Sequence, residues 1–285
     1  MRVQTVRKRV YSMKSALSTE KLTPPRNSPD KVTKVSHRGS RSNGSSYRYV
    51  YCIIPAEHAQ DIPDVTGIDD AGIRVMTRKK IGAVISDTIA NRHEILDNGV
   101  VHQQVVEEIQ KRSPLLPMGF GQVSTEASIL SFLEKNNYRL VMMMKQYSGK
   151  KELVLKASLK MDNVLKELSS SDDQIRILSN HINQNTSGEN HRMKIKIGRK
   201  VADSLERMND NIGGEFLKKL KPFSERVKIN KNLNREMFLN AAFLVNKNYE
   251  EKFDTAVDEL EARYHEIVSL SYIESAPYDF ISLRM

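Results

Sequence analysis

The chain has 285 residues, of which 39 % are hydrophobic and 28 % charged. This composition excludes a chain that is disordered throughout and allows one large domain or two of ordinary size. The net charge of +10 suggests a nucleic-acid binder, but residues 1–46 hold eleven Lys and Arg against two acidic residues. Residues 47–285 hold 34 basic and 33 acidic residues, so the excess charge belongs to an N-terminal tail and not to the body.

The cellular compartment is indicated by three features of the sequence. No stretch approaches the run of about 18 apolar residues that a membrane span needs. The basic N-terminus is not followed by an apolar segment, so a secretory signal is not expected. The lone Cys52 cannot form an internal disulfide, which fits the reducing cytoplasm. We therefore expect a soluble cytoplasmic protein.

Residues 1–46 are rich in Ser, Lys, Arg and Pro and bury too little apolar surface to become ordered. The segment 23–30 contains three prolines and cannot continue a helix, and residues 39–46 are typical of a flexible linker. We predict a disordered basic tail. A solvated extension is the favoured interpretation, and binding of RNA or an anionic surface is the alternative.

Residues 47–150 are predicted to form an N-terminal α+β domain. Patterns of β-branched and aromatic residues predict strands at 47–54, 73–76 and 81–86, the last two joined as a hairpin. Apolar residues at helical spacing predict a helix from Glu94. A short strand or turn at 115–121 is followed by two helices, one capped by Ser124 and one over 138–146. Residues 148–150 end the last helix and mark the domain boundary.

Residues 151–285 are predicted to follow the order β, helices, β, β, α, β. Strands are expected at 152–159, 226–229, 237–245 and 267–273, and a helix with Phe253 to Tyr264 on one face. Two long apolar stripes predict a helical arm over about 160–221, bent at Gly213-Gly214 and ended by Pro222. The order matches the split βαβ, or ferredoxin-like, pattern with an extended helical insert. The fold class is therefore α+β with two domains.

No pattern in the sequence predicts a catalytic, cofactor-binding or metal site. Cys52 lies in a strand-like run and is expected to be a buried, inert thiol. The seven histidines have no metal-site spacing and are expected to be isolated surface residues, at positions 37, 58, 93, 102, 181, 191 and 265. Segments 119–121 and 148–151 lack the full glycine pattern of phosphate loops and are expected to be turns. The acidic pairs 69–70 and 172–173 are expected to cap helices.

The tyrosines at 47, 49 and 51 share one face of the first strand by alternation. Exposed tyrosines in such a row could stack nucleic-acid bases. Only Arg48 offers a cation nearby, so packing in a core or an interface is favoured over base stacking. Nucleic acid is therefore not the expected partner of the body.

Six short segments stand in a fixed order along the chain. They are the aromatic strand with Pro-Ala at 49–56, Gly-Ile-Asp at 67–69, the strand at 81–87, Leu-Pro-Met-Gly-Phe-Gly at 116–121, Gly-Lys-Lys-Glu at 149–152 and Pro-Tyr-Asp-Phe at 277–280. Together they resemble the gas vesicle protein F/L family (GvpF/GvpL). Gly119 replaces the usual Arg of that family, and residues 274–276 replace a Gly-Pro-Trp. Residues 1–46 have no counterpart.

The resemblance implies a cytoplasmic accessory factor of gas vesicles with two α+β domains, the second a modified ferredoxin-like fold. It implies chaperone-like binding to the major hydrophobic shell protein and to other accessory proteins, a role in nucleation or assembly, and a minor presence in the vesicle. It implies no enzymatic activity and no cofactor. The alternative is an RNA- or ribosome-associated binding module that acts through the basic tail. No protein-contact residue is predicted.

Overall fold

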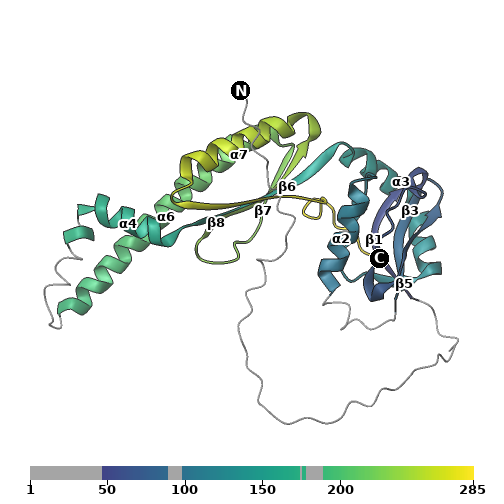
Figure 1. The fold of residues 1–285 in the computed structure, drawn as a ribbon, viewed down its shortest axis with the longest axis horizontal. Coiled ribbons are helices and arrows are strands. Elements are labelled where there is room, and N and C mark those ends of the chain that lie inside the picture. Colours follow the sequence, from purple (N-terminus) through teal and green to yellow (C-terminus); the bar gives the residue numbers. More distant parts are fainter. Residues whose placement is uncertain (1–46, 89–97, 174, 178–188) are drawn as a thin grey trace, which may run out of the picture.

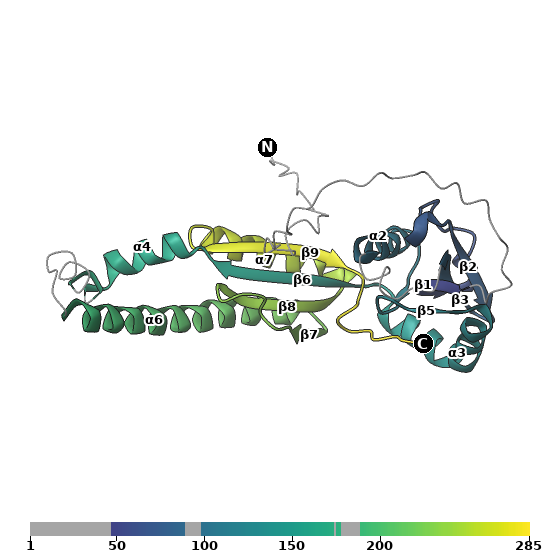
Figure 2. The same cartoon turned by 90° about the horizontal axis from the view of Figure 1, so that it is seen from below.

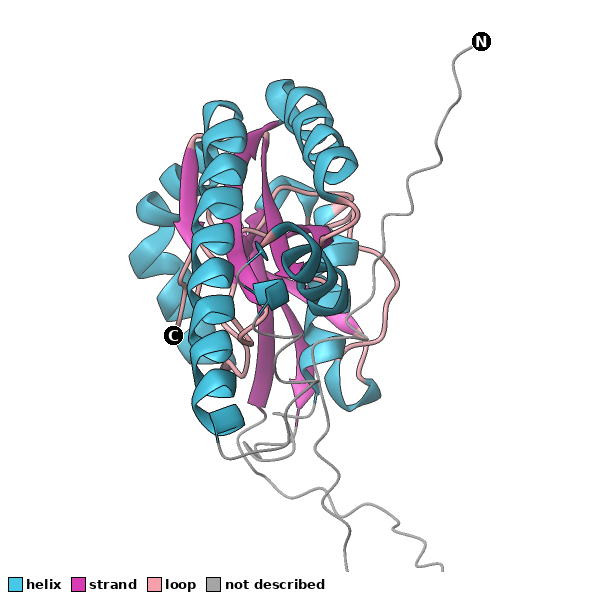
Figure 3. Cartoon of the chain, turned by 90° about the vertical axis from the view of Figure 1, so that its left-hand side faces the viewer, coloured by secondary structure: helices cyan, strands magenta, loops and turns pink. Residues whose placement is uncertain are grey.

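The structure is a computed structural model that describes residues 47–88, 98–173, 175–177 and 189–285. It combines helices with two antiparallel sheets (Figure 1), which confirms the α+β class. Coloured by secondary structure, Figure 3 shows helices flanking the strands. None of the helices in these ranges is both long enough and apolar enough to cross a membrane. The predicted tail lies outside the described residues, as does the predicted helix start at Glu94.

The first sheet lies in the N-terminal half of the chain and has the strand order β2-β3-β1-β4, with β5 also paired to β1. Its strands are β1 (Tyr47–Pro55), β2 (Ile73–Arg78), β3 (Ile81–Thr88), β4 (Leu116–Pro117) and β5 (Val123–Thr125). Helix α2 (Gly99–Gln110) packs on one face and helix α3 (Glu126–Tyr147) on the other. The hairpin predicted between β2 and β3 is present, with Lys79 at φ 57° in its turn.

A β-bulge interrupts the pairing of β1 with β3 between Val50 and Cys52. A bulge inserts one extra residue and so changes which face the following side chains take. Tyr51 and its neighbour Cys52 therefore both belong to the core beneath α2, whereas Val50 and Ile53 belong to the core beneath α3. Both faces of β1 are buried, which explains why this strand is apolar almost throughout.

Helix α3 is a single helix of 22 residues, so the prediction of two separate helices in this region is wrong. Its N-cap is Thr125, whose hydroxyl accepts from the N–H of Ser128, and not the predicted Ser124. The helix ends at Tyr147 as predicted, and Gly149 follows at φ 71°. Glycine adopts this left-handed conformation without steric cost, and it turns the chain into the next strand.

The second sheet has the strand order β7-β8-β6-β9, with every neighbouring pair antiparallel. Its strands are β6 (Lys150–Leu159), β7 (Arg226–Ile229), β8 (Met237–Asn246) and β9 (Val268–Ser275). The helices α4 (Met161–Ser171), α6 (Glu189–Leu220) and α7 (Glu250–Tyr264) contribute to one core on a single face of this sheet. Phe216, Phe243 and Phe253 are fully buried there. The predicted element order is confirmed.

Helix α6 has 32 residues and runs without interruption through Gly213-Gly214. Pro222 lies in the short helix η4 (Lys221–Phe223) that follows it, so the predicted end is confirmed. Figure 2 shows α4 and the N-terminal half of α6 projecting beyond the sheet as an arm. Residues 174 and 178–188 of the predicted helical arm lie outside the described residues. The division into domains at residues 150 and 151 stays a prediction.

Candidate functional site

The C-terminal segment 276–285 leaves β9 and runs back to the first sheet (Figures 1 and 2). Leu283 forms a parallel bridge with Met118, and its carbonyl accepts from the N–H of Gly119 at 3.0 Å. Ile281 and Leu283 are buried in the same apolar cluster as the core residues beneath α3. The end of the chain therefore fastens the second sheet to the first, and we call this region the junction.

At the junction, a buried histidine connects α2, β1 and the C-terminal segment. His102 Nδ1 lies 2.9 Å from the hydroxyl of Tyr49, and its Nε2 lies 3.1 Å from the hydroxyl of Tyr278. The Tyr49 hydroxyl also accepts from the N–H of Gly121 at 2.9 Å. Burial lowers the pKa of His102 to about 4, so the ring is neutral at pH 7. A neutral ring that accepts at Nδ1 and donates at Nε2 satisfies these contacts.

His102 corrects the expectation that the histidines are isolated surface residues, because only 3 % of its surface is exposed. His191 and His265 are exposed as expected, and His58 is half-buried. The histidines at 37, 93 and 181 lie outside the described residues. The sequence pattern could not distinguish His102 from the other histidines, because its hydrogen-bond partners come from distant parts of the chain.

A buried carboxyl forms the second part of the junction. Glu152 in β6 is 1 % exposed, and its Oε2 accepts from the N–H of Asp279 at 2.9 Å. Burial raises the pKa of Glu152 to about 8, and the negative charge of Asp279 acts in the same direction. Asp279 itself is held by Lys228 at 3.0 Å and by the amide of Asn230 at 2.8 Å. The segment is thus held through its backbone and its side chains.

Aromatic residues complete the junction. The Tyr147 hydroxyl donates to the carbonyl of Phe280 at 3.0 Å and accepts from Arg226 Nη1 at 3.0 Å. The guanidinium of Arg226 lies 5.3 Å from the centre of the Phe280 ring, a cation–π distance. Three segments that carried the family resemblance, 116–121, 149–152 and 277–280, therefore meet at one place.

Gly119 stands where the resemblance expects an arginine. Its N–H donates to Leu283, and a Cβ at this position would lie 3.8 Å from the side chain of Arg284. A basic side chain therefore lies beside position 119 even though the residue there is glycine. Glycine at 119 carries no charged side chain and so makes no ion pair of its own.

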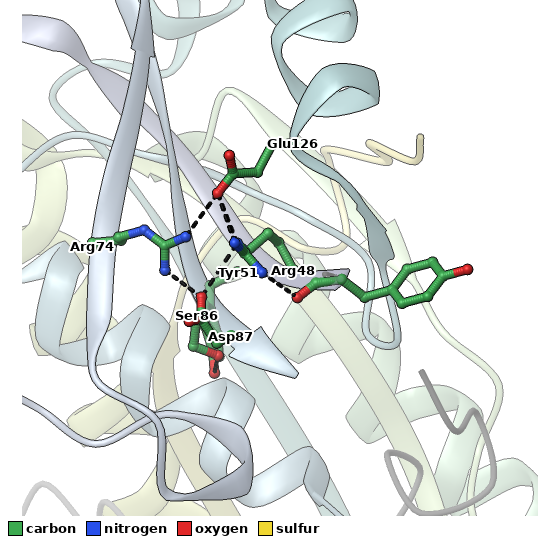
Figure 4. Close-up of polar contacts among 7 residues, drawn as sticks. Arg48, Tyr51, Arg74, Ser86, Asp87 and Glu126 are labelled. Atoms are coloured by element: carbon green, nitrogen blue, oxygen red, sulfur yellow. Dashed lines mark hydrogen bonds and ion pairs between the residues drawn. The ribbon is translucent and has the colours of Figure 1, made fainter. Parts of the chain in front are cut away.

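A second polar cluster fixes the start of β1 to α3 (Figure 4). Arg48, which is 9 % exposed, contacts Glu126 at 2.8 Å and Asp87 at 3.2 Å. Arg74 pairs with the same two carboxylates. Hydrogen bonds from Arg48 and Arg74 lower the pKa of Glu126. The beginning of β1, the edge strand β2 and the first turn of α3 are thereby held together.

The other residues singled out in the sequence have structural roles. Tyr49 and Tyr51 have no exposed surface, so the base-stacking alternative is wrong for them and core packing is confirmed. Cys52 is buried as expected, and burial raises its thiol pKa. Asp172 accepts from the N–H of Ile175 at 3.1 Å, which confirms capping for this residue.

Two further expectations concern glycine and acidic segments. Gly121 and Gly149 have φ values of 80° and 71°, which confirms turns at both glycine segments. Asp69 and Asp70 also have positive φ values, and Asp69 accepts from the hydroxyl of Thr88 at 2.6 Å, so this pair does not cap a helix. Within the described ranges, no cluster of three or more His, Cys, Asp or Glu side chains could hold a metal ion.

Comparison with known proteins places these features in a family. The model of the family described as "Gas vesicle synthesis protein GvpL/GvpF" matches residues 47–282. The chain is 23 % identical over 236 residues to gas vesicle protein F of Streptomyces sp. (strain CB03234), covering 82 % of this chain and 98 % of that protein. It is 22 % identical over 247 residues to gas vesicle protein F of Dolichospermum flosaquae, covering 82 % and 97 %.

Two solved structures share the fold. The crystal structure of gas vesicle protein GvpF from Anabaena sp. PCC7120 matches with a TM-score of 0.66 at 23 % identity, covering 85 % of this chain and all of that one. The structure of GvpF from Microcystis aeruginosa matches with a TM-score of 0.60 at 21 % identity, covering 84 % of this chain and all of that one. The chain therefore shares its overall fold with these two structures.

Proposed function

Because the chain belongs to the gas vesicle synthesis protein GvpL/GvpF family, we propose that it is an accessory factor of gas vesicle assembly that binds the major hydrophobic shell protein. The family match over residues 47–282 carries the proposal. The factor acts in the cytoplasm as a chaperone-like, non-enzymatic protein, contacts other accessory proteins, assists nucleation and remains as a minor vesicle component.

The topology of the second sheet bears on whether the C-terminal domain is ferredoxin-like. Its order β7-β8-β6-β9, with the helices on one face, supports a ferredoxin-like C-terminal domain at 151–285. In this description α4 and α6 form the extended helical insert between the first two strands of the domain. The N-terminal domain at 47–150 then supplies the other sheet and its free edge.

An apolar shell subunit needs a partner that covers its exposed strands until it is built into a wall. Strand β2 offers a suitable surface, because it lies at the edge of the first sheet and, among the strands that the structure describes, pairs only with β3. Side chains along β2 are half-buried up to Met76 and exposed at Thr77 and Arg78. A strand of the shell protein can add to this edge by main-chain hydrogen bonds.

The charges on β2 do not oppose such an addition. Arg74 is paired with Asp87 and with Glu126, the latter at 3.0 Å (Figure 4). Arg78 is paired with Glu134 at 2.8 Å. Edge strands commonly carry free charges that discourage pairing with another chain, whereas the arginines of β2 are engaged by their own sheet and by α3.

Proline at Thr77 tests this surface. Arg78 and Ile81 flank the two-residue turn and form its hydrogen-bonded pair, so alternation directs the N–H of Thr77 away from β3. We expect Thr77→Pro to leave the sheet intact and to lower binding of purified shell protein at least tenfold. The control Lys135→Ala, an exposed change on α3, keeps full binding. Unchanged binding by Thr77→Pro would remove the β2 edge from the proposal.

The broader function is tested by deletion and by capture. Loss of the gene should abolish or shorten gas vesicles in the producing cell, and the full chain should retain shell protein on an affinity column. Normal vesicles together with no retention would refute the proposed function. Removal of residues 1–46 separates the RNA alternative, since that alternative requires nucleic-acid binding that falls steeply with salt and disappears with the tail.

A further inference from the structure

The exposed face of α6 carries six charged side chains at positions that alternate by four and three residues. Such spacing places all six on one stripe along the helix. They are Arg192, Lys196, Arg199, Asp203, Glu206 and Asp210, and all are exposed. The opposite side of the helix supplies Val201, Leu205 and Met208 to the core of the second sheet. We call these six residues the charged stripe.

The charged stripe is divided by sign, with three basic residues toward the tip of the arm followed by three acidic residues. No side chain of the stripe makes an ion pair or hydrogen bond with another described residue. Lys200 differs, since it pairs with Asp172 of the chain itself at 3.2 Å. The stripe therefore presents separated blocks of positive and negative charge to solvent.

We propose that the charged stripe is the contact by which two copies of this chain pair their α6 helices antiparallel. Arg192 then faces Asp210 of the partner copy, since both lie nine positions from residue 201. Lys196 faces the partner's Glu206, and Arg199 faces the partner's Asp203, by the same symmetry. The two-fold axis passes level with Val201, and every one of the six side chains meets a residue of opposite charge.

Charge complementarity favours a second copy over other partners. The basic block spans only about 10 Å of helix, and the acidic block beside it repels phosphate groups, so a nucleic acid would meet too few cations. An acidic peptide would pair with Arg192, Lys196 and Arg199 but leave the three acidic residues unmatched. Only a partner with the reverse order of charges satisfies both blocks, and an antiparallel copy has that order.

A groove beside the stripe adds an apolar contact. It has a volume of about 410 Å³ and is lined by residues of α6, the β7–β8 loop and β8, among them Leu205, Met237 and Phe238. Ile195 lies on the same flank of the stripe by helical spacing and is 45 % exposed. The two-fold axis places the same flank of both helices on one side of the pair. Ile195 of the partner copy therefore lies level with residue 207, beside the groove.

The resulting dimer is expected to be weak and sensitive to salt. Exposed ion pairs contribute little individually, and they are screened as the Debye length falls from about 10 Å at 0.1 M salt to about 3 Å at 1 M. The dissociation constant should therefore rise by roughly threefold or more over this range. This inference goes beyond the proposed function and does not rest on it.

Two complementary charge reversals test the pairing on the full chain. The first variant carries Arg192→Glu, Lys196→Glu and Arg199→Glu, and the second carries Asp203→Lys, Glu206→Lys and Asp210→Lys. In each variant all six charges of the stripe have the same sign, so two copies of that variant repel each other. Sedimentation velocity at low salt should show wild-type mass rising above the 32.6 kDa of one chain as concentration increases. Each variant alone should stay monomeric, and an equimolar mixture should form a heterodimer.

A matched control separates stripe pairing from net charge. Lys135→Glu, Arg139→Glu and Lys145→Glu make the same charge change on exposed positions of α3, and this variant should dimerise like wild type. Circular dichroism confirms that all variants are folded. A wild-type chain that is monomeric at every concentration would overturn the proposal, and so would two monomeric variants that fail to associate when mixed.

Discussion

Glu152 is a buried carboxyl whose ionisation should destabilise the fold at mildly alkaline pH. Burial raises its pKa from 4.5 to about 8, so the folded chain keeps a proton that the unfolded chain has lost. The folded state binds more protons in this interval, and its stability must fall as the pH rises. The contribution of protonated Glu152 to the stability of the fold is fully present below pH 4.5 and is lost as the pH rises through 8.

The size of the effect follows from the shift. One pKa unit corresponds to about 1.4 kcal/mol, so the full shift amounts to about 5 kcal/mol. His102 works in the opposite sense below pH 6.5, because burial lowers its pKa from 6.5 to about 4. Above pH 6.5 the contribution of Glu152 dominates, and it should lower the free energy of unfolding by about 2 kcal/mol between pH 6.5 and 9.

The substitution Glu152→Gln isolates this contribution, since its side-chain carbonyl can still accept from the N–H of Asp279 but does not ionise. Urea unfolding of wild type and variant at half-unit steps from pH 5.5 to 9 gives the difference directly. We expect the variant to gain on wild type by about 2 kcal/mol between pH 6.5 and 9. Parallel pH profiles for the two proteins would refute the argument from burial.

Two further predictions concern His102 at the junction and Phe216 in the core of the second sheet. His102→Gln should remove the His102 part of the pH dependence, so the variant should gain on wild type by about 3 kcal/mol as the pH falls from 6.5 to 4, since burial depresses the folded pKa of His102. Urea unfolding of both proteins measures this difference, and a constant difference between them across the range would contradict the prediction. Phe216→Ala should cost about 3–5 kcal/mol because Phe216 is fully buried, whereas Ile229→Ala, at a residue 57 % exposed, should cost less than about 1 kcal/mol in the same assay.

The fold was predictable where periodicity was strong and uninterrupted. The apolar stripe of α6 and the alternation in β6 placed these elements correctly within a few residues. The pattern failed in α3, where the polar residues Asn136 and Asn137 interrupt the apolar face. The structure shows their amides bonded to the carbonyls of Phe132 and Arg78, so tertiary and local contacts hold the helix together where the sequence suggested a break.

The junction was not predictable from local pattern, because its contacts join residues far apart in the chain. Glu152 and Asp279 are separated by 127 positions, and His102 and Tyr278 by 176. Each of these polar residues resembles an ordinary surface residue when considered alone. The segments that carried the family resemblance did include Glu152, Tyr278 and Asp279, yet only the structure shows that they meet.

Antiparallel pairing of α6 would have a consequence for shell binding, because the arm points away from the chain's own first sheet (Figure 2). The two β2 edges would then lie at opposite ends of the dimer, separated by more than the length of α6, about 48 Å. Two edges that engage one shell polymer bind with an avidity that neither has alone. The variant Arg192→Glu, Lys196→Glu, Arg199→Glu should thus match wild type toward a single shell subunit but bind the polymer roughly tenfold more weakly or worse. An equal loss toward both forms would mean instead that the charged stripe itself contacts the shell.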